Sequence, residues 1–264
     1  MLTAVKNQVR VTLLTTKYAL IREMLNKTTF FMNIVFMMLN NACFIVQWII
    51  LYSIKDGIGG YQFHQILLLW GIAASTFGFS RCFFCKAFSL SEVIQNGKLD
   101  SFLIQPKNVL LSVAISEIST SAIGDLIYGY IMLFISGFSV PKFFLFTLFT
   151  ISGGFILVSV TVILSSLSFW FQKADMISEV GDSLLTSFAT YPEGIFQGTM
   201  KILFYTIIPI GFINYLPIQI LTEFHLGFTM LILLISCFFV TLAFTIFHLG
   251  LKRYSSSNLM ISKI

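Results

Sequence analysis

The apolar residues of this chain come in unbroken blocks, and that arrangement limits most strongly what the chain can become. Ile202–Ile213 and Phe228–Phe247 are apolar on every face of a helix, which suits a helix surrounded by lipid. Only 10% of the 264 residues are charged, whereas an ordinary globular chain carries roughly a quarter. The sequence therefore predicts an integral membrane protein.

A bilayer core of ~30 Å needs about 20 helical residues. With that length as the guide, we expect an all-α membrane fold with six transmembrane helices, forming a single transmembrane domain over residues 1–264. The predicted spans are Phe30–Ile54, Phe63–Phe84, Leu110–Phe138, Phe143–Trp170, one span within the interrupted region Gly181–Thr222, and Leu226–Leu251. The first 29 residues show no cleavable signal pattern, so we expect the helices themselves to direct insertion.

The basic residues predict the orientation. With a cytoplasmic N-terminus, thirteen Lys and Arg residues fall in inside segments and only Lys55, Lys142 and Lys201 fall outside. Because positive charge stays on the cytoplasmic side, both termini are expected there. The net charge of +5 then points to anionic lipid at the inner leaflet and requires no nucleic-acid partner.

Two polar segments are expected on the cytoplasmic surface. Within residues 1–29, Val5–Leu25 has apolar residues near helical spacing among basic ones, which predicts an amphipathic helix on the membrane or on a docked partner. Residues 86–107 are too polar to span the membrane. Apolar residues alternate with charged ones within them, which is not typical of an irregular loop. One or two short helices are expected there, with Gly97 ending a helix and Pro106 beginning or breaking the next.

Residues 191–222 form a broken or re-entrant region. Pro192, Pro209 and Pro217 interrupt apolar sequence, and a broken helix at membrane depth must face protein or water. Such breaks often belong to a substrate path. In one layout a helix from about Gly181 rises to Pro192 and a re-entrant stretch follows. In the other, Met200–Leu221 is itself the span.

Polar residues inside the predicted spans are candidates for a transport path. Glu117, Ser121 and Asp125 follow a four-residue spacing that places them on one face of the third span. They would line a transport path or proton-coupled site, or pair structurally with a polar or basic group on another helix. In the first span, Asn40 lies midway between Asn33 and Gln47 at seven-residue intervals. This stripe fits helix–helix hydrogen bonding or a cavity between two subunits.

The sequence has no signature of catalysis. No phosphate-binding loop is present, and there is no zinc-protease, serine-hydrolase or Cys/His metal motif. The Cys82-x-x-Cys85 pair is interpreted as packing rather than as a metal or redox site. We therefore predict that the chain is not an enzyme and holds no metal or cofactor.

Three stretches together resemble the permease subunits of type-2 ABC exporters, in the six-span bacterial subfamily without a fused ATPase. The first is Asn96–Pro106 (NGKLDSFLIQP), similar to a G-x-L-D-x-x-L-x-x-P signature, although Gln105 stands where the family commonly has Arg. The second is the Gly124-Asp125 pair. The third begins at Tyr191-Pro192 and continues over Ile208–Pro217 (IPIGFINYLP).

The resemblance implies a pair of permeases in the bacterial cell membrane, each bound to a separate cytoplasmic ATPase that holds ATP and Mg²⁺. It places the coupling to that ATPase on Glu92, Gly97, Leu99, Asp100 and Pro106. The polar positions in the spans and the broken region would form the pathway and gate, namely Asn33, Asn40, Gln47, Glu117, Asp125, Tyr191, Pro192, Phe196, Pro209, Asn214, Tyr215 and Pro217. The expected cargo is a hydrophobic or amphipathic peptide, lipid or drug. The alternative is an ion-coupled secondary transporter that uses Asp125 and Glu117.

Overall fold

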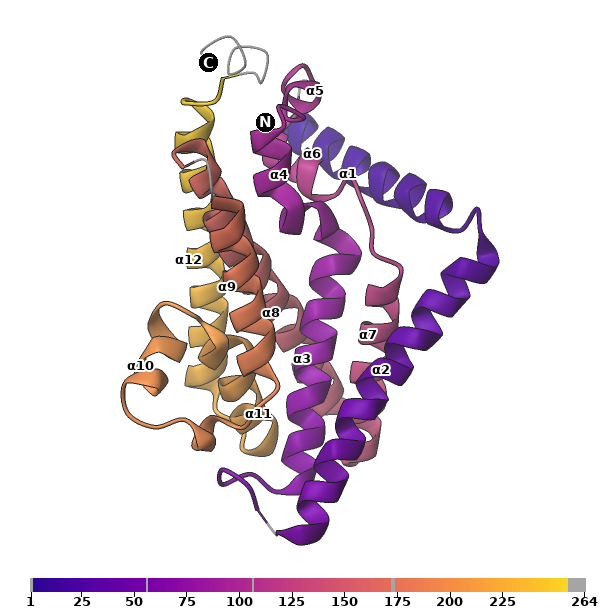
Figure 1. Ribbon diagram of the computed structural model, residues 1–264, viewed down its shortest axis with the longest axis vertical. Helices are drawn as coiled ribbons and strands as arrows, with labels where there is room; N and C mark the ends of the chain where they lie inside the picture. Colours follow the sequence, from indigo (N-terminus) through magenta and orange to yellow (C-terminus); the bar gives the residue numbers. More distant parts are fainter. Residues whose placement is uncertain (1, 56, 106, 172–173, 256–264) are drawn as a thin grey trace.

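The computed structural model describes residues 2–55, 57–105, 107–171 and 174–255. Across these residues the regular structure is helical, and Ile58 and Tyr61 form the one isolated β-bridge. The helices form an elongated bundle in which the long ones run roughly along the longest axis (Figure 1). The prediction of an all-α membrane fold is confirmed at this level.

Four helices of the described residues are long and apolar enough to cross a bilayer. They are α2 (Lys27–Ile54), α3 (Phe63–Phe84), α8 (Val140–Ser166) and α12 (Leu226–Leu251). The predicted bounds of α3 and α12 are confirmed at both ends. α2 begins earlier than expected, at Lys27, because the side chain of Asn26 accepts a hydrogen bond from the backbone N–H of Thr29 and so caps the helix.

The third predicted span, Leu110–Phe138, is wrong as one continuous helix. It consists of α6 (Val109–Ala114) and α7 (Ser121–Gly137), separated by non-helical residues 115–120. In this break the backbone N–H of Ser119 donates to the carbonyl oxygen of Arg81 on α3, and Glu117 forms an ion pair with Lys86. These contacts to another part of the chain replace intrahelical bonds.

The region between α8 and α12 contains α9 (Ala174–Ala189), α10 (Thr199–Thr206), a π-helical turn (Gly211–Tyr215) and α11 (Leu216–Thr222). α10 and the segment from the π-turn onward are bent by 78° relative to each other. A straight span over Met200–Leu221 is therefore wrong. A helix does precede Pro192, as the first layout expects, but it begins at Ala174 rather than near Gly181.

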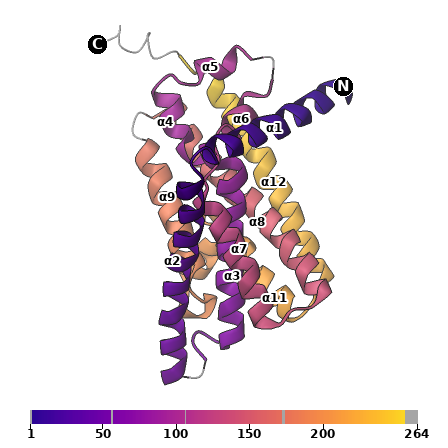
Figure 2. The same ribbon diagram turned by 90° about the vertical axis from the view of Figure 1, so that its right-hand side faces the viewer.

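Both polar segments predicted for one membrane surface contain helices. α1 (Leu2–Glu23) projects sideways from the bundle and crosses it at a steep angle (Figures 1 and 2). α3 continues through a 3₁₀ turn (Cys85–Ser89) into α4 (Leu90–Gln95), and α5 (Asp100–Leu103) follows. α1, α4, α5 and the last turn of α12 gather at one end of the molecule (Figure 1).

Small residues allow the central helices to approach closely. A Cβ at Gly129 of α7 would collide with Ser75 and Gly71 of α3, and a Cβ at Gly124 would collide with the backbone of Ile34 on α2. Packing on small residues drives helix association in lipid, where apolar burial alone gives little preference. The glycines thus fix α7 between α2 and α3.

Candidate functional site

A groove of about 340 Å³ lies where α2, α3 and α9 meet. It is lined by Phe44, Gln47, Trp48, Leu51, Trp70, Thr186, Ser187, Thr190 and Tyr191. Aromatic rings form much of the wall, and the non-aromatic polar groups are one amide from α2 and three Ser and Thr hydroxyls at or just after the end of α9. A lining of this mixed kind suits an amphipathic molecule, because apolar surface binds its body and a few polar groups orient it.

The predicted polar stripe on α2 divides into two roles. Gln47 lines the groove, and Asn40, one seven-residue interval earlier, is exposed on the same stripe. Asn33 instead donates a hydrogen bond of 3.0 Å to the hydroxyl of Thr120, just before α7. Asn33 therefore joins α2 to the N-terminus of α7 by a hydrogen bond, as the helix–helix interpretation expects. Gln47 instead lines the groove.

Asp125 is buried between α7 and α2. The Nδ2 group of Asn41 donates a hydrogen bond of 2.6 Å to its Oδ1 atom, and both side chains are buried. A buried carboxylate needs such a partner, since an unsatisfied polar group at this depth is costly. The structural pairing that the sequence offered for Asp125 is thus present, with Asn41 as its partner.

Glu117 does not share a helical face with Ser121 and Asp125, because the helix is broken at Glu117. Its carboxylate lies 2.9 Å from the Nζ atom of Lys86. The expectation of one acidic face along the third span is therefore wrong.

A second partnered acid lies on α9 and escaped the sequence analysis. The hydroxyl of Thr161 on α8 donates a hydrogen bond of 2.7 Å to Asp182. The sequence signal was available, since Asp182 is the last acid of α9 and only apolar and hydroxyl-bearing residues follow it in the helix.

The π-helical turn holds the end of α9. Asn214 donates to the carbonyl oxygen of Ala189 at 2.7 Å, and the Tyr215 hydroxyl donates to that of Phe188 at 3.0 Å. The last carbonyls of a helix have no intrahelical partner. Asn214 supplies one for Ala189, and Tyr215 adds a second donor to the Phe188 oxygen, which also accepts from the backbone N–H of Tyr191. The predicted gate residues Asn214 and Tyr215, both fully buried, therefore act first as a cap for α9.

The three prolines of this region lie at or next to helix ends, as the sequence predicted. Pro192 follows the end of α9, Pro209 lies in the break between α10 and the π-turn, and Pro217 is in the first turn of α11. Tyr191 meets Trp48 of α2 edge-on at 6.2 Å between ring centroids, and the Phe196 ring packs against Phe204 of α10 at 4.9 Å.

Glu193, directly after Pro192, is a buried acid that the sequence analysis missed. Its Oε1 atom lies 3.1 Å from the Nζ atom of Lys201 and accepts a hydrogen bond of 3.2 Å from the Tyr205 hydroxyl. An acid beside a proline break, with a lysine eight residues later, was the signal that pointed to it. The ion pair between Glu193 and Lys201 thus links the turn after α9 to α10.

The connection between α2 and α3 packs against this turn. A Cβ added at Gly194 would collide with the backbone of Gly59, and Gly59 has a positive φ of 59°. Burial, with the neighbouring Glu193 as a lesser cause, raises the pKa of Tyr61 in the same connection. The phenol therefore stays neutral.

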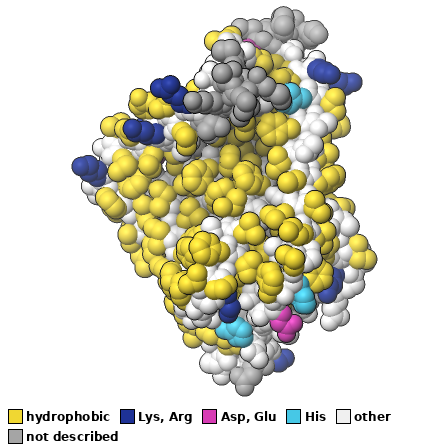
Figure 3. Space-filling view, turned by 180° about the vertical axis from the view of Figure 1, so that it is seen from behind, with side chains coloured by type: hydrophobic (Ala, Val, Ile, Leu, Met, Phe, Trp, Pro, Cys, Tyr) yellow, Lys and Arg dark blue, Asp and Glu magenta, His cyan; other side chains and the backbone are white. Residues whose placement is uncertain are grey.

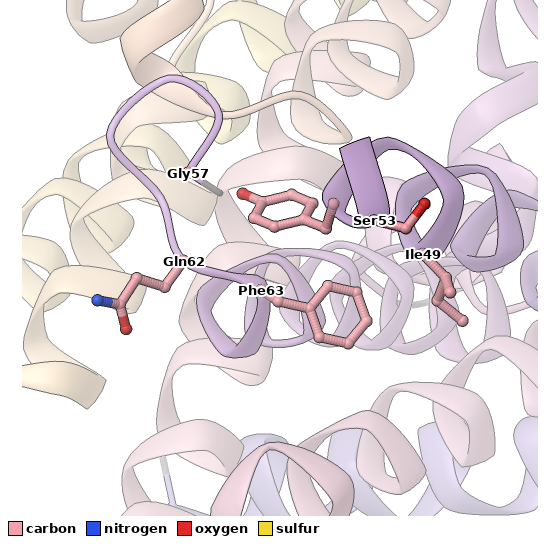
Figure 4. A pocket seen from close by; sticks show the side chains of 6 residues that line it. Ile49, Ser53, Gly57, Gln62 and Phe63 are labelled. Carbon is pink, nitrogen blue, oxygen red and sulfur yellow. The ribbon is translucent and has the colours of Figure 1, made fainter. Parts of the chain in front are cut away.

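A shallower pocket of about 560 Å³ opens beside the same connection. Figure 4 shows Ile49 and Ser53 on α2, Phe63 at the start of α3, and Gly57 and Gln62 in the loop between them. The loop is held by a hydrogen bond of 2.7 Å from the Tyr52 hydroxyl to the carbonyl oxygen of Tyr61. The pocket lies at the end of the molecule away from α4 and α5 (Figure 1).

The segment predicted to couple to an ATPase is ordered and anchored. α4 ends at Gln95, and Gly97, directly after the C-cap residue Asn96, has a φ of +68° that suits glycine. The fully buried Leu99 packs in an apolar cluster with α6, α8 and α12. Glu92 and Lys98 form an exposed ion pair at 2.8 Å. Pro106 lies outside the described residues.

The chain after α12 reaches this segment. Burial, and then the neighbouring carboxylate of Asp100, raise the pKa of Tyr254. The Tyr254 ring also packs edge-on against Phe169 at 6.2 Å between centroids. The end of α12 is therefore in contact with the α4–α5 segment.

No group of His, Cys, Asp and Glu side chains able to hold a metal ion is found in residues 2–55, 57–105, 107–171 and 174–255. The four cysteines, all within that part, are unpaired.

Comparison with known proteins gives one match. The profile of the family described as ABC-2 family transporter protein matches residues 36–258, which is far more than half of the chain. No curated protein matches, and no solved structure matches. The match covers the groove, the broken third span, the α4–α5 segment and the bent region alike. This chain belongs to the ABC-2 family of membrane transport proteins.

Proposed function

We propose that this chain is the permease subunit of an ATP-driven exporter that moves a hydrophobic or amphipathic substrate. The observation that carries this proposal is the family match over residues 36–258. In the proposed assembly two permeases, identical or homologous, form the path, and a separate ATPase binds each one from the cytoplasm. The ATPase subunits hold ATP and Mg²⁺.

The proposal includes six membrane crossings in the cell membrane of a bacterium. Four are α2, α3, α8 and α12, the fifth combines α6 with α7, and the sixth is the region from α9 to α11. α9 rises from the cytoplasmic side, and α10 and α11 form a re-entrant segment on the far side. The collection of α1, α4, α5 and the end of α12 at one end of the bundle supports a common cytoplasmic side for both termini (Figure 1).

In this assembly the α4–α5 segment is the coupling element. Its inner face is anchored by the buried Leu99, while Glu92 and Lys98 are exposed. A segment that is already ordered before binding suits docking in a groove of a partner, because little conformational entropy is lost when it binds. Its exposed charged face would make the contact.

The groove between α2, α3 and α9 is proposed as part of the substrate path. α2 is mostly exposed along its length, with Phe44 and Gln47 on the exposed surface. A second permease facing this surface would close the groove and leave its amide and hydroxyl groups inside. Tyr191 lines the groove. A gate that includes Tyr191 would therefore lie beside the end of α9, where Asn214 and Tyr215 bind the last carbonyls.

The ion-coupled alternative is not favoured. Asp125 accepts a hydrogen bond from Asn41, and Glu117 is paired with Lys86 in a break of the helix. The two acids thus have separate partners and do not form a common relay.

The test is purification of the chain with the ATPase encoded beside it. We expect the two proteins to co-purify, and we expect vanadate-sensitive ATP hydrolysis in lipid that increases with an amphipathic substrate. Absence of both an ATPase partner and nucleotide-dependent transport would overturn the proposal. Substrate flux driven by a proton gradient without ATP would favour the alternative.

A further inference from the structure

A narrow apolar pocket of about 70 Å³ lies between α6, α8 and α12, on the far side of the bundle from the groove. It is lined by Phe84, Leu110, Leu111, Ala114, Phe155, Val158, Ser159, Val162, Val240, Ala243 and Phe244. The side chains at its base are buried, Val162 and Ala243 among them. The pocket is far smaller than the ~300–1,000 Å³ of sites for drug-sized molecules.

The walls of the pocket offer no free hydrogen-bonding side chain. Ser159 is the polar residue of the lining, and its hydroxyl already donates a hydrogen bond of 2.6 Å to the carbonyl oxygen of Phe155. An occupant must therefore be apolar, and the volume fits part of one acyl chain. Figure 3 views the molecule from this side, where apolar side chains cover the middle and charged and histidine side chains lie toward the two ends.

Basic side chains continue from the pocket toward the end that holds α4 and α5. At intervals of four residues, Val240, Phe244 and His248 form one stripe on α12, which the C-cap residue Lys252 continues. His248 stacks on Phe244 at an interplanar angle of 23°, and its Nδ1 atom lies 2.7 Å from the carbonyl oxygen of Phe244. This contact leaves Nε2 of the exposed ring for a ligand.

Lys107 adds a second cation from the neighbouring element. It lies just before α6, four residues ahead of Leu111 in the pocket wall. Leu110, three residues after Lys107, belongs to an apolar cluster against which Leu251, the neighbour of Lys252, is packed. Among the residues that the structure describes, neither Lys107 nor Lys252 takes part in an ion pair.

We propose that this site binds a phospholipid with an anionic headgroup from the adjoining leaflet. One acyl chain enters the pocket between α6, α8 and α12, and the headgroup phosphate contacts Lys107, His248 and Lys252. Each Lys or Arg near an anionic membrane surface contributes about 1 kcal/mol, so two lysines correspond to roughly a thirtyfold preference over a zwitterionic lipid. The lipid would join α12 to α6 and thereby to the α4–α5 segment. The inference does not depend on which substrate is transported.

The test is native mass spectrometry of the intact chain in a neutral detergent, titrated with phosphatidylglycerol or phosphatidylcholine of the same acyl chains. We expect one phosphatidylglycerol bound about thirtyfold more tightly than phosphatidylcholine. The double variant K107Q/K252Q is expected to lose this preference. The matched variant K17Q/K27Q removes two exposed lysines from α1 and the start of α2 and is expected to retain it.

A second arm tests the acyl chain. Val240→Phe adds bulk at the pocket wall and is expected to weaken binding of both lipids several-fold, while Leu234→Phe, on an exposed part of α12, leaves binding unchanged. Equal affinity for the two lipids in the unaltered protein would overturn the proposal, as would an equal loss of preference in both lysine variants. Helix content and melting temperature of every variant are compared, and if Val240→Phe does not fold, the lysine arm decides alone.

Discussion

The side-chain amide of Asn214 donates a hydrogen bond of 2.7 Å to the backbone oxygen of Ala189, and this bond fastens the π-helical turn to the end of α9. Tyr215 makes the neighbouring contact to Phe188. A π-helical turn therefore satisfies backbone groups at the open end of α9. A rearrangement of α10 and α11 must break these two bonds or carry α9 along.

Removing the cap is expected to destabilise the protein. Asn214→Ala leaves the carbonyl oxygen of Ala189 buried without a partner, which costs roughly 1–3 kcal/mol, and Tyr215→Phe, which removes only a hydroxyl, costs about 1 kcal/mol. Thermal unfolding in detergent measures both. Thr222→Val is the control, because its hydroxyl bonds only within α11. If Asn214→Ala and Thr222→Val melt alike, the cap is not important for stability.

Replacing Asp125 separates the two functional proposals. Asp125→Asn keeps the size of the side chain and a group that can pair with Asn41, so substrate-stimulated ATP hydrolysis is expected to stay within about twofold of the original, a difference of about 0.4 kcal/mol. Asp125→Leu leaves the Asn41 amide without a partner, and a lower melting temperature is expected. Transport that Asp125→Asn abolishes in a folded protein would instead support ion coupling.

A glycine-to-alanine substitution, which adds one methyl group, tests the close contact between the α2–α3 connection and the turn after α9. Gly194→Ala places a Cβ against the backbone of Gly59, and because neither backbone can yield easily, a loss of roughly 1–3 kcal/mol is expected. Gly227→Ala, in α12 with no atom within 4 Å of the added Cβ, is expected to have no effect or to stabilise slightly. The two melting temperatures decide the matter, and a Gly194→Ala protein as stable as Gly227→Ala would contradict the packing.

The α4–α5 segment is expected to affect partner binding more than stability. The Glu92–Lys98 ion pair is exposed, so Glu92→Ala changes the melting temperature little, because such pairs contribute about 0–1 kcal/mol. Co-purification of the ATPase and its stimulated hydrolysis are expected to fall several-fold. Lys55→Ala, an exposed charge change directly after α2, is the control. Equal hydrolysis in the two variants would remove Glu92 from the coupling surface.

Long apolar runs were sufficient to locate four membrane helices. The bounds Phe63–Phe84 and Leu226–Leu251 follow from hydropathy and from breaks in the sequence on either side. The same reasoning did not predict the helix break at residues 115–120. Hydropathy carries no information about the ion pair that Glu117 forms with Lys86 in this break. Local sequence also did not reveal the 78° bend after α10, since a proline marks a break and not its angle.

The amino-acid sequence by itself determined that this protein lies in a membrane, where α3 and α12 begin and end, and where prolines break the backbone after α9. Those properties depend on transfer of side chains from water to lipid and on the fixed φ of proline, which act locally. Only the tertiary structure decided which polar groups meet. Asn41 and Asp125 are 84 positions apart, and no local pattern joins them. In lipid a buried polar group must find a partner on another helix, and the helix that supplies it is fixed by the packing of the whole bundle.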